Sequence, residues 1–528
     1  MPDLVMLHNS RIYKLLPLSW QDYQQTFNHR MIAHDVLSHL LFLLNIKCFN
    51  SAQLKIPPRS IMKKVITGLL LASSFLASAA EPEFNTQQLK QVAELRDNAS
   101  NSDLSYQLLE SLTTEVGPRL PGTENDKKAV AWAQAKFKQL GFDKVWLEEA
   151  TFPEWRRFSE SGKILTPSEQ SLHLTALGHS ISTPKDGITA EVILFETLDE
   201  LIAAPANSLK GKIAYINYRM NRHIDGNGYG PAVRARSTGS VEAAKKGAIG
   251  YMMRSVSTAH HRFAHTGGSH YQDGVTKIPN VTIANPDADQ IARLIALGKN
   301  VTVNINVQTE DRGQGTGYNV IGQFNGTQNP EQYVLIGGHL DSWDLGTGAL
   351  DDGAGVALTM AAAKHISEIK RPKRSIRVVL FAAEELGLWG AKAYFKQHAN
   401  ELDKIVAAAE SDFGADVVYG FESNVSAASL PVVRAIAKQL APLNVEYIGK
   451  NSANGGPDLI PFRNATSAPI FELHQNGTDY FDYHHTADDT LDKVDPAKLK
   501  QNTAAYAVFA FMAADAKTTI KAKPVASK

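Results

Sequence analysis

YVLIGGHLDSW, residues 333–343, joins an apolar run to a histidine and an aspartate. Further apolar runs lie at 376–383, 405–409 and 470–473, and helical patterns lie between them at 355–367, 387–398 and 432–440. Apolar runs that alternate with helices are typical of a mostly parallel sheet with helices on both faces. We therefore expect an α/β fold in which His339 lies at the carboxyl end of a central strand.

Acidic and histidine residues follow these strands or close a nearby loop. In chain order they are His339 and Asp341, Asp351 and Asp352, Glu384 and Glu385, Glu410 and Asp412, and His484 and His485. Ligands of α/β sheets bind beyond the carboxyl ends of the strands, so we expect these groups at one edge of the sheet. Acids clustered in this way are costly unless cations neutralise them.

The donor types indicate which metal such a site would bind. Imidazole nitrogen and carboxylate oxygen, without thiolate, favour zinc. Taken alone, each group has a structural explanation: Glu384-Glu385 as an acidic helix start, Asp351-Asp352 as part of a turn, and His339 as a satisfied polar residue. Because five such groups are expected at one edge of a single sheet, we favour the metal site.

Composition excludes several classes of protein. The length of 528 residues predicts two to four domains. With 43% hydrophobic and 20% charged residues, the chain fits neither a disordered polymer nor a multi-span membrane protein. Basic and acidic residues are equal at 54 each, so we expect no nucleic-acid partner. Neither a G-x-S-x-G elbow nor a Walker loop is present, which disfavours a serine hydrolase and a nucleotide enzyme.

A secretory signal peptide is predicted at 62–80. Met62-Lys63-Lys64 is followed by an apolar stretch too short to span a bilayer and by small residues up to Ala80. We expect translation to begin at Met62, which makes 1–61 an upstream extension foreign to the native protein. The single cysteine, Cys48, lies in that extension, so the exported protein would contain no thiol. The protein is expected to be periplasmic or secreted, without a stable membrane anchor.

The middle of the chain has a different pattern of predicted secondary structure from the rest. Between 190 and 308 short β-rich runs alternate with brief helices, which predicts a separate smaller domain. We expect this domain to interrupt a larger one formed by 81–189 and 309–518, with a C-terminal tail at 519–528.

The order of the acidic and histidine groups resembles a known family. His339-Leu340-Asp341, Asp351-Asp352-Gly353-Ala354-Gly355, Glu384-Glu385, Asp412 and His485-Thr486 match the co-catalytic di-zinc peptidases of the M28 type. The longer strings at 338–344 and 371–374, with 117–120 upstream, are similar to the carboxypeptidase Q branch. The resemblance extends over about 105–514, and it implies that the β-rich segment is an inserted protease-associated domain.

The resemblance implies two zinc ions per chain. His339 and Asp412 would hold one, Glu385 and His485 would hold the other, and Asp351 would bridge both. A bridging carboxylate keeps two cations about 3.5–4 Å apart, where they can share a water.

Two further roles come from the same resemblance. Glu384 would be the general base, because it stands next to a ligand and can move a proton from water to the leaving amine. Asp341 would accept the second ring N–H of His339 and fix its tautomer. The peptide bond between Asp351 and Asp352 is expected to be cis.

One position departs from the family pattern. Several relatives carry a tyrosine just before the final histidine, where it can hydrogen-bond the oxyanion, but this chain has His484 there and Tyr483 one residue earlier. His484 and Tyr483 are the candidates for that donor, and the alternative is that His484 replaces His485 as the ligand. We favour His485, because it directly precedes Thr486.

The expected substrates are short peptides, foremost dipeptides with free termini. Candidate pocket walls are Asn454 and Asp458, within 454–458, and the middle-domain stretch 265–277. Histidines 260, 261, 265 and 270 are expected in a solvated loop, and Trp343 is expected to pack under the metal site. A broader aminopeptidase and a non-catalytic peptide-binding protein are the alternatives. The family also suggests a homodimer.

Overall fold

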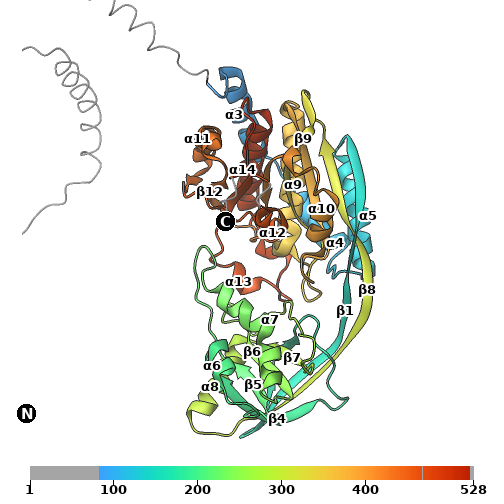
Figure 1. Cartoon of the computed structure of the whole chain (residues 1–528), viewed down its shortest axis with the longest axis vertical. Helices are drawn as coiled ribbons and strands as arrows, with labels where there is room; N and C mark the ends of the chain where they lie inside the picture. Colours follow the sequence, from blue (N-terminus) through green and yellow to red (C-terminus); the bar gives the residue numbers. More distant parts are fainter. Residues whose placement is uncertain (1–81, 466–467, 524–528) are drawn as a thin grey trace, which may run out of the picture. The chain divides into compact units, whose positions relative to one another are not determined.

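The computed structural model describes residues 82–465 and 468–523 (Figure 1). The predicted signal peptide, the extension before it and Cys48 lie outside the described residues. None of the helices in the described part of the chain combines the length and the apolarity that crossing a membrane requires.

Four adjacent parallel strands form the centre of the large sheet. Their order is β14 (Ile470–Gln475), β11 (Ile405–Glu410), β9 (Asn329–His339) and β10 (Arg374–Phe381). Antiparallel strands flank them: β12 (Val418–Asn424) beside β14, and β8 (Thr302–Phe324) beside β10. Beyond these lie β13 (Glu446–Tyr447) and β1 (Lys144–Thr166). The prediction of a mostly parallel central sheet is confirmed.

Helices cover both faces of this sheet because its strands are apolar on both sides. Val334 and Ile336 of β9 belong to the core that includes α9 (Ala354–Ile369) and α14 (Pro496–Asp515). Leu335, between them, belongs to the core that includes α10 (Trp389–Gln397) and α12 (Ile460–Asn464). Successive strand residues point to opposite faces, so a continuous apolar run needs cover on both.

The remaining helices of this part pack around the same core. They are α3 (Thr86–Ser100), α4 (Leu104–Glu115), α5 (Glu124–Gln139), α11 (Leu430–Leu440) and α13 (Tyr480–Tyr483). The turn between α4 and α5 carries Arg119, which is fully buried and donates to the carbonyls of Thr347 (2.6 Å) and Gly348 (2.9 Å). This side chain therefore ties the turn to the loop that follows β9.

Strands β1 and β8 pair antiparallel along nearly their whole length and carry the chain into the middle segment (Figure 1). That segment contains four neighbouring parallel strands: β4 (Ile188–Phe195), β5 (Ile213–Ile216), β6 (Gly250–Arg254) and β7 (Asn280–Ile283). Two short strands, β2 (Gln170–Leu172) and β3 (Leu174–Ala176), and three helices, α6 (Leu198–Ala203), α7 (Tyr229–Lys245) and α8 (Asn285–Ala296), complete it.

The middle segment is less β-rich than predicted. Helix α7 has 17 residues, whereas only brief helices were expected here, because its first turns contain small and polar residues with little apolar periodicity. Strand β8 also passes unbroken through the predicted boundary at 308, since it stays paired with β1 on both sides of it. We call 170–300, between the two long strands, the insert.

Candidate metal centre

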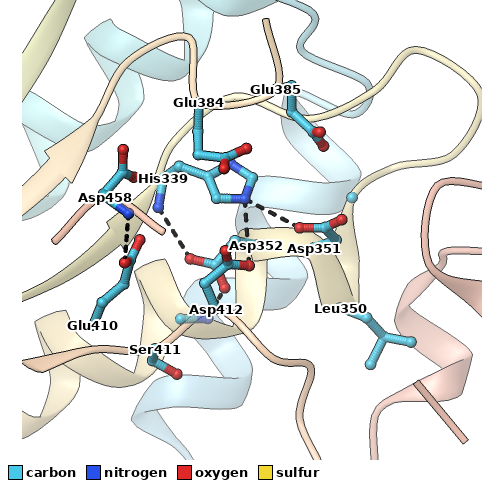
Figure 2. A network of polar contacts seen from close by, with 12 residues as sticks. His339, Leu350, Asp351, Asp352, Glu384, Glu385, Glu410, Ser411, Asp412 and Asp458 are labelled. Carbon is cyan, nitrogen blue, oxygen red and sulfur yellow. Dashed lines mark hydrogen bonds and ion pairs between the residues drawn. The ribbon is translucent and has the colours of Figure 1, made fainter. Parts of the chain in front are cut away.

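The predicted site residues meet at the carboxyl ends of the central strands (Figure 2). His339 is the last residue of β9, and Glu384-Glu385 and Asp412 follow β10 and β11 within four residues. Asp351 lies in the short turn η1 (Ala349–Gly353), and its peptide bond to Asp352 is cis, as the resemblance implied. The final histidines follow α13.

Asp351 stands between two imidazoles that come from distant parts of the chain. Its Oδ1 lies 3.1 Å from Nε2 of His339, and its Oδ2 lies 3.0 Å from Nε2 of His485. All three side chains are buried. Each carboxylate oxygen thus faces a different ring nitrogen, which is the arrangement needed for one carboxylate to serve two cations.

Two further carboxylates complete a set of donors around each imidazole. Asp412 Oδ1 lies 3.6 Å from His339 Nε2, and Glu385 Oε2 lies 3.1 Å from His485 Nε2. Within the described part of the chain, three groups have donor atoms within 4.8 Å of one another: His339 with Asp351 and Glu385, His339 with Asp352 and Asp412, and Asp351 with His484 and His485. The structure therefore brings together all five residues predicted as ligands.

The second ring nitrogens distinguish the two final histidines. His485 Nδ1 lies 3.2 Å from the carbonyl of Thr266, so in the neutral ring Nδ1 carries the proton and Nε2 is the atom with the lone pair. His484 Nδ1 has no hydrogen-bond partner, and its Nε2 lies 3.4 Å from Asp351. The rings stack with centroids 3.5 Å apart. The fixed tautomer and the added contact with Glu385 favour His485 as the ligand.

The donor set fits divalent cations. Asp351 Oδ2 and Glu385 Oε1 are buried and have no hydrogen-bond partner. Burial, with the charges of Asp412 and Glu385 adding to it, raises the pKa of Glu384 well above its usual value. Burial is also the main cause of the raised pKa of Asp352. These buried carboxylates lie close together and have free lone pairs, and bound cations would neutralise their charge.

Asp341 acts differently from the prediction. The backbone carbonyl of Asp341, at 3.0 Å, accepts from His339 Nδ1, whereas its carboxylate lies 3.8 Å from that nitrogen. The carboxylate instead accepts from the backbone N–H groups of Glu384 (3.0 Å) and Glu385 (3.2 Å). One residue therefore fixes the tautomer of His339 and the position of both glutamates.

Two carboxylates hold the backbone around the bridging residue. Asp352 accepts from the backbone N–H groups of His339 (3.1 Å) and Gly355 (3.2 Å). Asp489 accepts from the N–H groups of Leu350 (2.6 Å) and Asp351 (3.2 Å). Sequence reasoning missed Asp489, because it follows no strand and its role depends on a contact across 138 residues.

The insert reaches the metal centre through its backbone. Thr266 donates its N–H to the carbonyl of His485 (3.0 Å) and accepts from the ring of the same histidine. His265 was expected in a solvated loop, but it is 1% exposed, and burial lowers its pKa to about 3. The loop is anchored because Ser255 Oγ accepts from His265 N–H (2.9 Å).

A cavity of about 860 Å³ opens beside the metal centre. Glu384, Asn454 and His484, all predicted site residues, line it. Asp458 is fully buried next to Glu410, whose Oε2 accepts from its backbone N–H (2.8 Å), and is not among the lining residues.

Two aromatic residues near the centre do not line the cavity. The ring of Tyr483 lies against His261, with centroids 6.0 Å apart, so Tyr483 does not fit the predicted oxyanion role. Trp343 is buried with its ring 5.8 Å from that of His485, as expected of a packing residue.

Comparison with known proteins agrees with this geometry. The model of peptidase family M28 matches residues 319–510. Carboxypeptidase Q of Mus musculus is 35% identical over 412 residues, which cover 78% of this chain and 86% of that protein. The chain belongs to peptidase family M28.

A solved structure extends the match to the whole M28 fold. The crystal structure of a peptidase M28 precursor from Shewanella amazonensis SB2B is 49% identical and superposes with a TM-score of 0.81, covering 83% of this chain and 99% of that one. An aminopeptidase from Aneurinibacillus sp. strain AM-1, 22% identical with a TM-score of 0.56, covers 83% of this chain and 98% of its own and shares the fold. The predicted family and the class of metal-dependent exopeptidase are confirmed.

Proposed function

We propose that this M28 peptidase is an exported di-zinc enzyme that hydrolyses short peptides, foremost dipeptides with free termini. The observation that carries the proposal is Asp351, whose two oxygens face Nε2 atoms of His339 and His485 at 3.1 and 3.0 Å. One zinc would be held by His339, Asp412 and Asp351, and the other by His485, Glu385 and Asp351. Zinc bound there supplies Lewis acidity toward a water and a peptide carbonyl.

Glu384 is the proposed general base. It lines the cavity beside the ligands. Asp341 accepts from its backbone N–H and so holds Glu384 in place without engaging its carboxylate, which stays free for proton transfer. In the reaction, the Glu384 carboxylate takes a proton from the attacking water as the carbon–oxygen bond forms. It then gives that proton to the departing nitrogen as the peptide bond breaks, which releases an amine and a carboxylic acid.

His484 is the proposed donor to the oxyanion. It lines the cavity, and its Nε2 lies 3.4 Å from Asp351 Oδ2 on the bridging carboxylate. A donor held in a buried site stabilises negative charge that develops on the carbonyl oxygen more strongly than water does. In this role His484 replaces the tyrosine that several relatives carry.

The substrate class rests on the relatives and on the cavity. The curated relatives named carboxypeptidase Q match over most of their length, whereas the aminopeptidase structure shares only the fold. A cavity of about 860 Å³ lies in the range of sites for small ligands and suits a short peptide. Export is proposed from the signal-peptide pattern at 62–80 and is tested by sequencing the N-terminus of the exported protein.

The test combines metal analysis with a peptide panel. We expect about two zinc ions per chain, hydrolysis of neutral dipeptides, loss of hydrolysis on chelation and recovery with zinc. N-acetylated and C-amidated dipeptides separate the alternatives: an aminopeptidase cleaves the amide as well as the free acid, whereas a dipeptidase needs both free ends. A zinc-loaded protein that cleaves none of these peptides would contradict the proposal.

A further inference from the structure

The insert supplies one wall of the cavity beside the metal centre. Helix α7 contributes Tyr229, Val233 and Arg236 to it, and the connection between β6 and β7 contributes Gly268 and His270. On the other side lie the acidic residues of the metal centre. A peptide in this cavity therefore contacts two chemically different surfaces.

Arg236 is a buried cation without a counterion. Its residue is 8% exposed, and its Nε and Nη1 atoms have no hydrogen-bond partner. Among the ion pairs that the described residues form, none includes Arg236. A buried guanidinium with unused donors is costly, and an anionic ligand would remove that cost.

The surroundings hold this guanidinium in place and close to the metal centre. A Cβ on Gly267 would come within 2.3 Å of Arg236 Nη1, so the guanidinium lies directly against the glycine backbone. The ring of Tyr229 lies 5.9 Å from the guanidinium carbon and 5.8 Å from the ring of His484. The ring of Tyr229 therefore neighbours both Arg236 and a histidine of the metal centre.

The charges near Arg236 favour an anion. Lys392 and His270 line the same cavity, and burial, followed by the positive charges of Lys392 and Arg236, lowers the pKa of His270. At the metal centre the cavity is lined by carboxylates, among them Glu384 and Asp412. A short peptide carries one anionic group at its C-terminus, and a planar guanidinium binds a carboxylate through two parallel hydrogen bonds.

We propose that Arg236 binds the C-terminal carboxylate of the peptide substrate and makes a free C-terminus a requirement for hydrolysis. This inference rests on the proposed peptidase function and assigns its specificity to the insert. The carboxylate lies against Arg236, and the scissile carbonyl lies toward Glu384. A C-terminus held at Arg236 while the scissile bond lies at the metal centre leaves room for only a short leaving part, so hydrolysis removes residues from the C-terminal end of the peptide.

The test compares a neutral dipeptide, leucyl-alanine, with its C-terminal amide. Wild type is expected to prefer the free acid by at least about 100-fold in kcat/KM. Arg236→Met should lower kcat/KM for the acid by about 100- to 1,000-fold and change the amide less than about threefold, because only the acid uses the guanidinium. In Arg236→Lys, kcat/KM for the acid should lie between the values of wild type and Arg236→Met, because lysine keeps the charge but cannot form the two parallel hydrogen bonds.

Arg234→Met is the matched control. Arg234 lies on the same helix, but it is exposed and pairs with Asp199 at 2.9 Å, so both substrates should react as in wild type. Binding is measured separately by calorimetry in zinc-loaded Glu384→Gln protein, where the acid should bind more tightly than the amide only while Arg236 is present.

Three results would overturn the assignment: equal loss for acid and amide in Arg236→Met, equal cleavage of both by wild type, or equal calorimetric affinity for both. Cleavage of neither peptide by wild type would contradict the proposed function. In that case the calorimetric comparison still decides the role of Arg236.

Discussion

At the scale of single residues, the metal centre depends on which nitrogen of each histidine carries the proton. Carbonyl oxygens of Asp341 and Thr266 accept from the Nδ1 atoms of His339 and His485. A carbonyl only accepts, so in the neutral ring the proton is on Nδ1 and the Nε2 lone pair of each histidine faces Asp351. The backbone thus prepares both rings for cations before any cation binds.

The role of Glu384 is tested by Glu384→Gln. Gln keeps the shape and removes the base, so turnover of leucyl-alanine should fall by about 10²- to 10⁴-fold. Zinc content should stay near that of wild type, because Glu384 is not among the proposed ligands. Glu368→Gln, a surface change on α9 whose side chain is 52% exposed, serves as the control. Turnover within threefold of wild type in Glu384→Gln would refute the assignment.

The sequence predicted which residues converge at the site. It predicted only in part the hydrogen bonds that hold these residues in position. His339, Asp351, Glu385, Asp412 and His485 come at strand ends or in loops with distinctive neighbours, so their convergence followed from the topology. The contact of Asp341 with the backbone of the glutamates depends on the path of a loop. That path is set by tertiary packing, which no local pattern encodes.

At the scale of elements, α14 supports the strands from which the site residues emerge. It is buried along nearly its whole length. Phe509 contacts the rings of Phe471 on β14 (centroids 4.9 Å apart) and Phe421 on β12 (6.0 Å). A helix that is apolar all round shows no amphipathic stripe, so the sequence pattern did not delimit α14, whereas the short apolar runs of β9, β10 and β11 were recognised.

Phe509→Ala should lower the free energy of unfolding by about 3–5 kcal/mol, because it removes an aromatic ring from a packed interior. Denaturant unfolding followed by circular dichroism measures the change. Phe158→Ala is the matched control: that residue is 66% exposed on β1, and its loss should change the free energy by about 0.5 kcal/mol or less. Similar losses for both variants would show that α14 does not stabilise the sheet as argued.

At the scale of the whole molecule, the insert and the peptidase part share one site. Asp482, in α13, accepts from Arg222 (2.6 Å) and from Thr258 (2.7 Å) of the insert, and the carbonyl of Phe481 in the same helix accepts from Ser257 (2.9 Å). The sequence predicted a second unit and a pocket between the two. It could not predict which insert residues reach the site, because Thr266 and His485 are 219 residues apart.

Metal removal tests whether cations hold this assembly together. Binding to the folded state alone stabilises it, by about 4 kcal/mol for one site at a thousand times the dissociation constant. Chelation should therefore lower the melting temperature by roughly 5–10 °C, because buried Asp351 and Glu385 oxygens lose their partners. Scanning calorimetry with and without chelator, and after zinc is restored, measures the shift.

Asp351→Asn provides the internal comparison. Asn keeps the size of the side chain but removes the charge that both cations would share, so zinc content and the shift caused by chelation should each fall below half of the wild-type values. Without chelator the variant should melt near the chelated wild type, since both lack bound cations. A wild-type melting temperature that stays constant while analysis shows the zinc to be gone would mean that protein contacts alone balance these carboxylates.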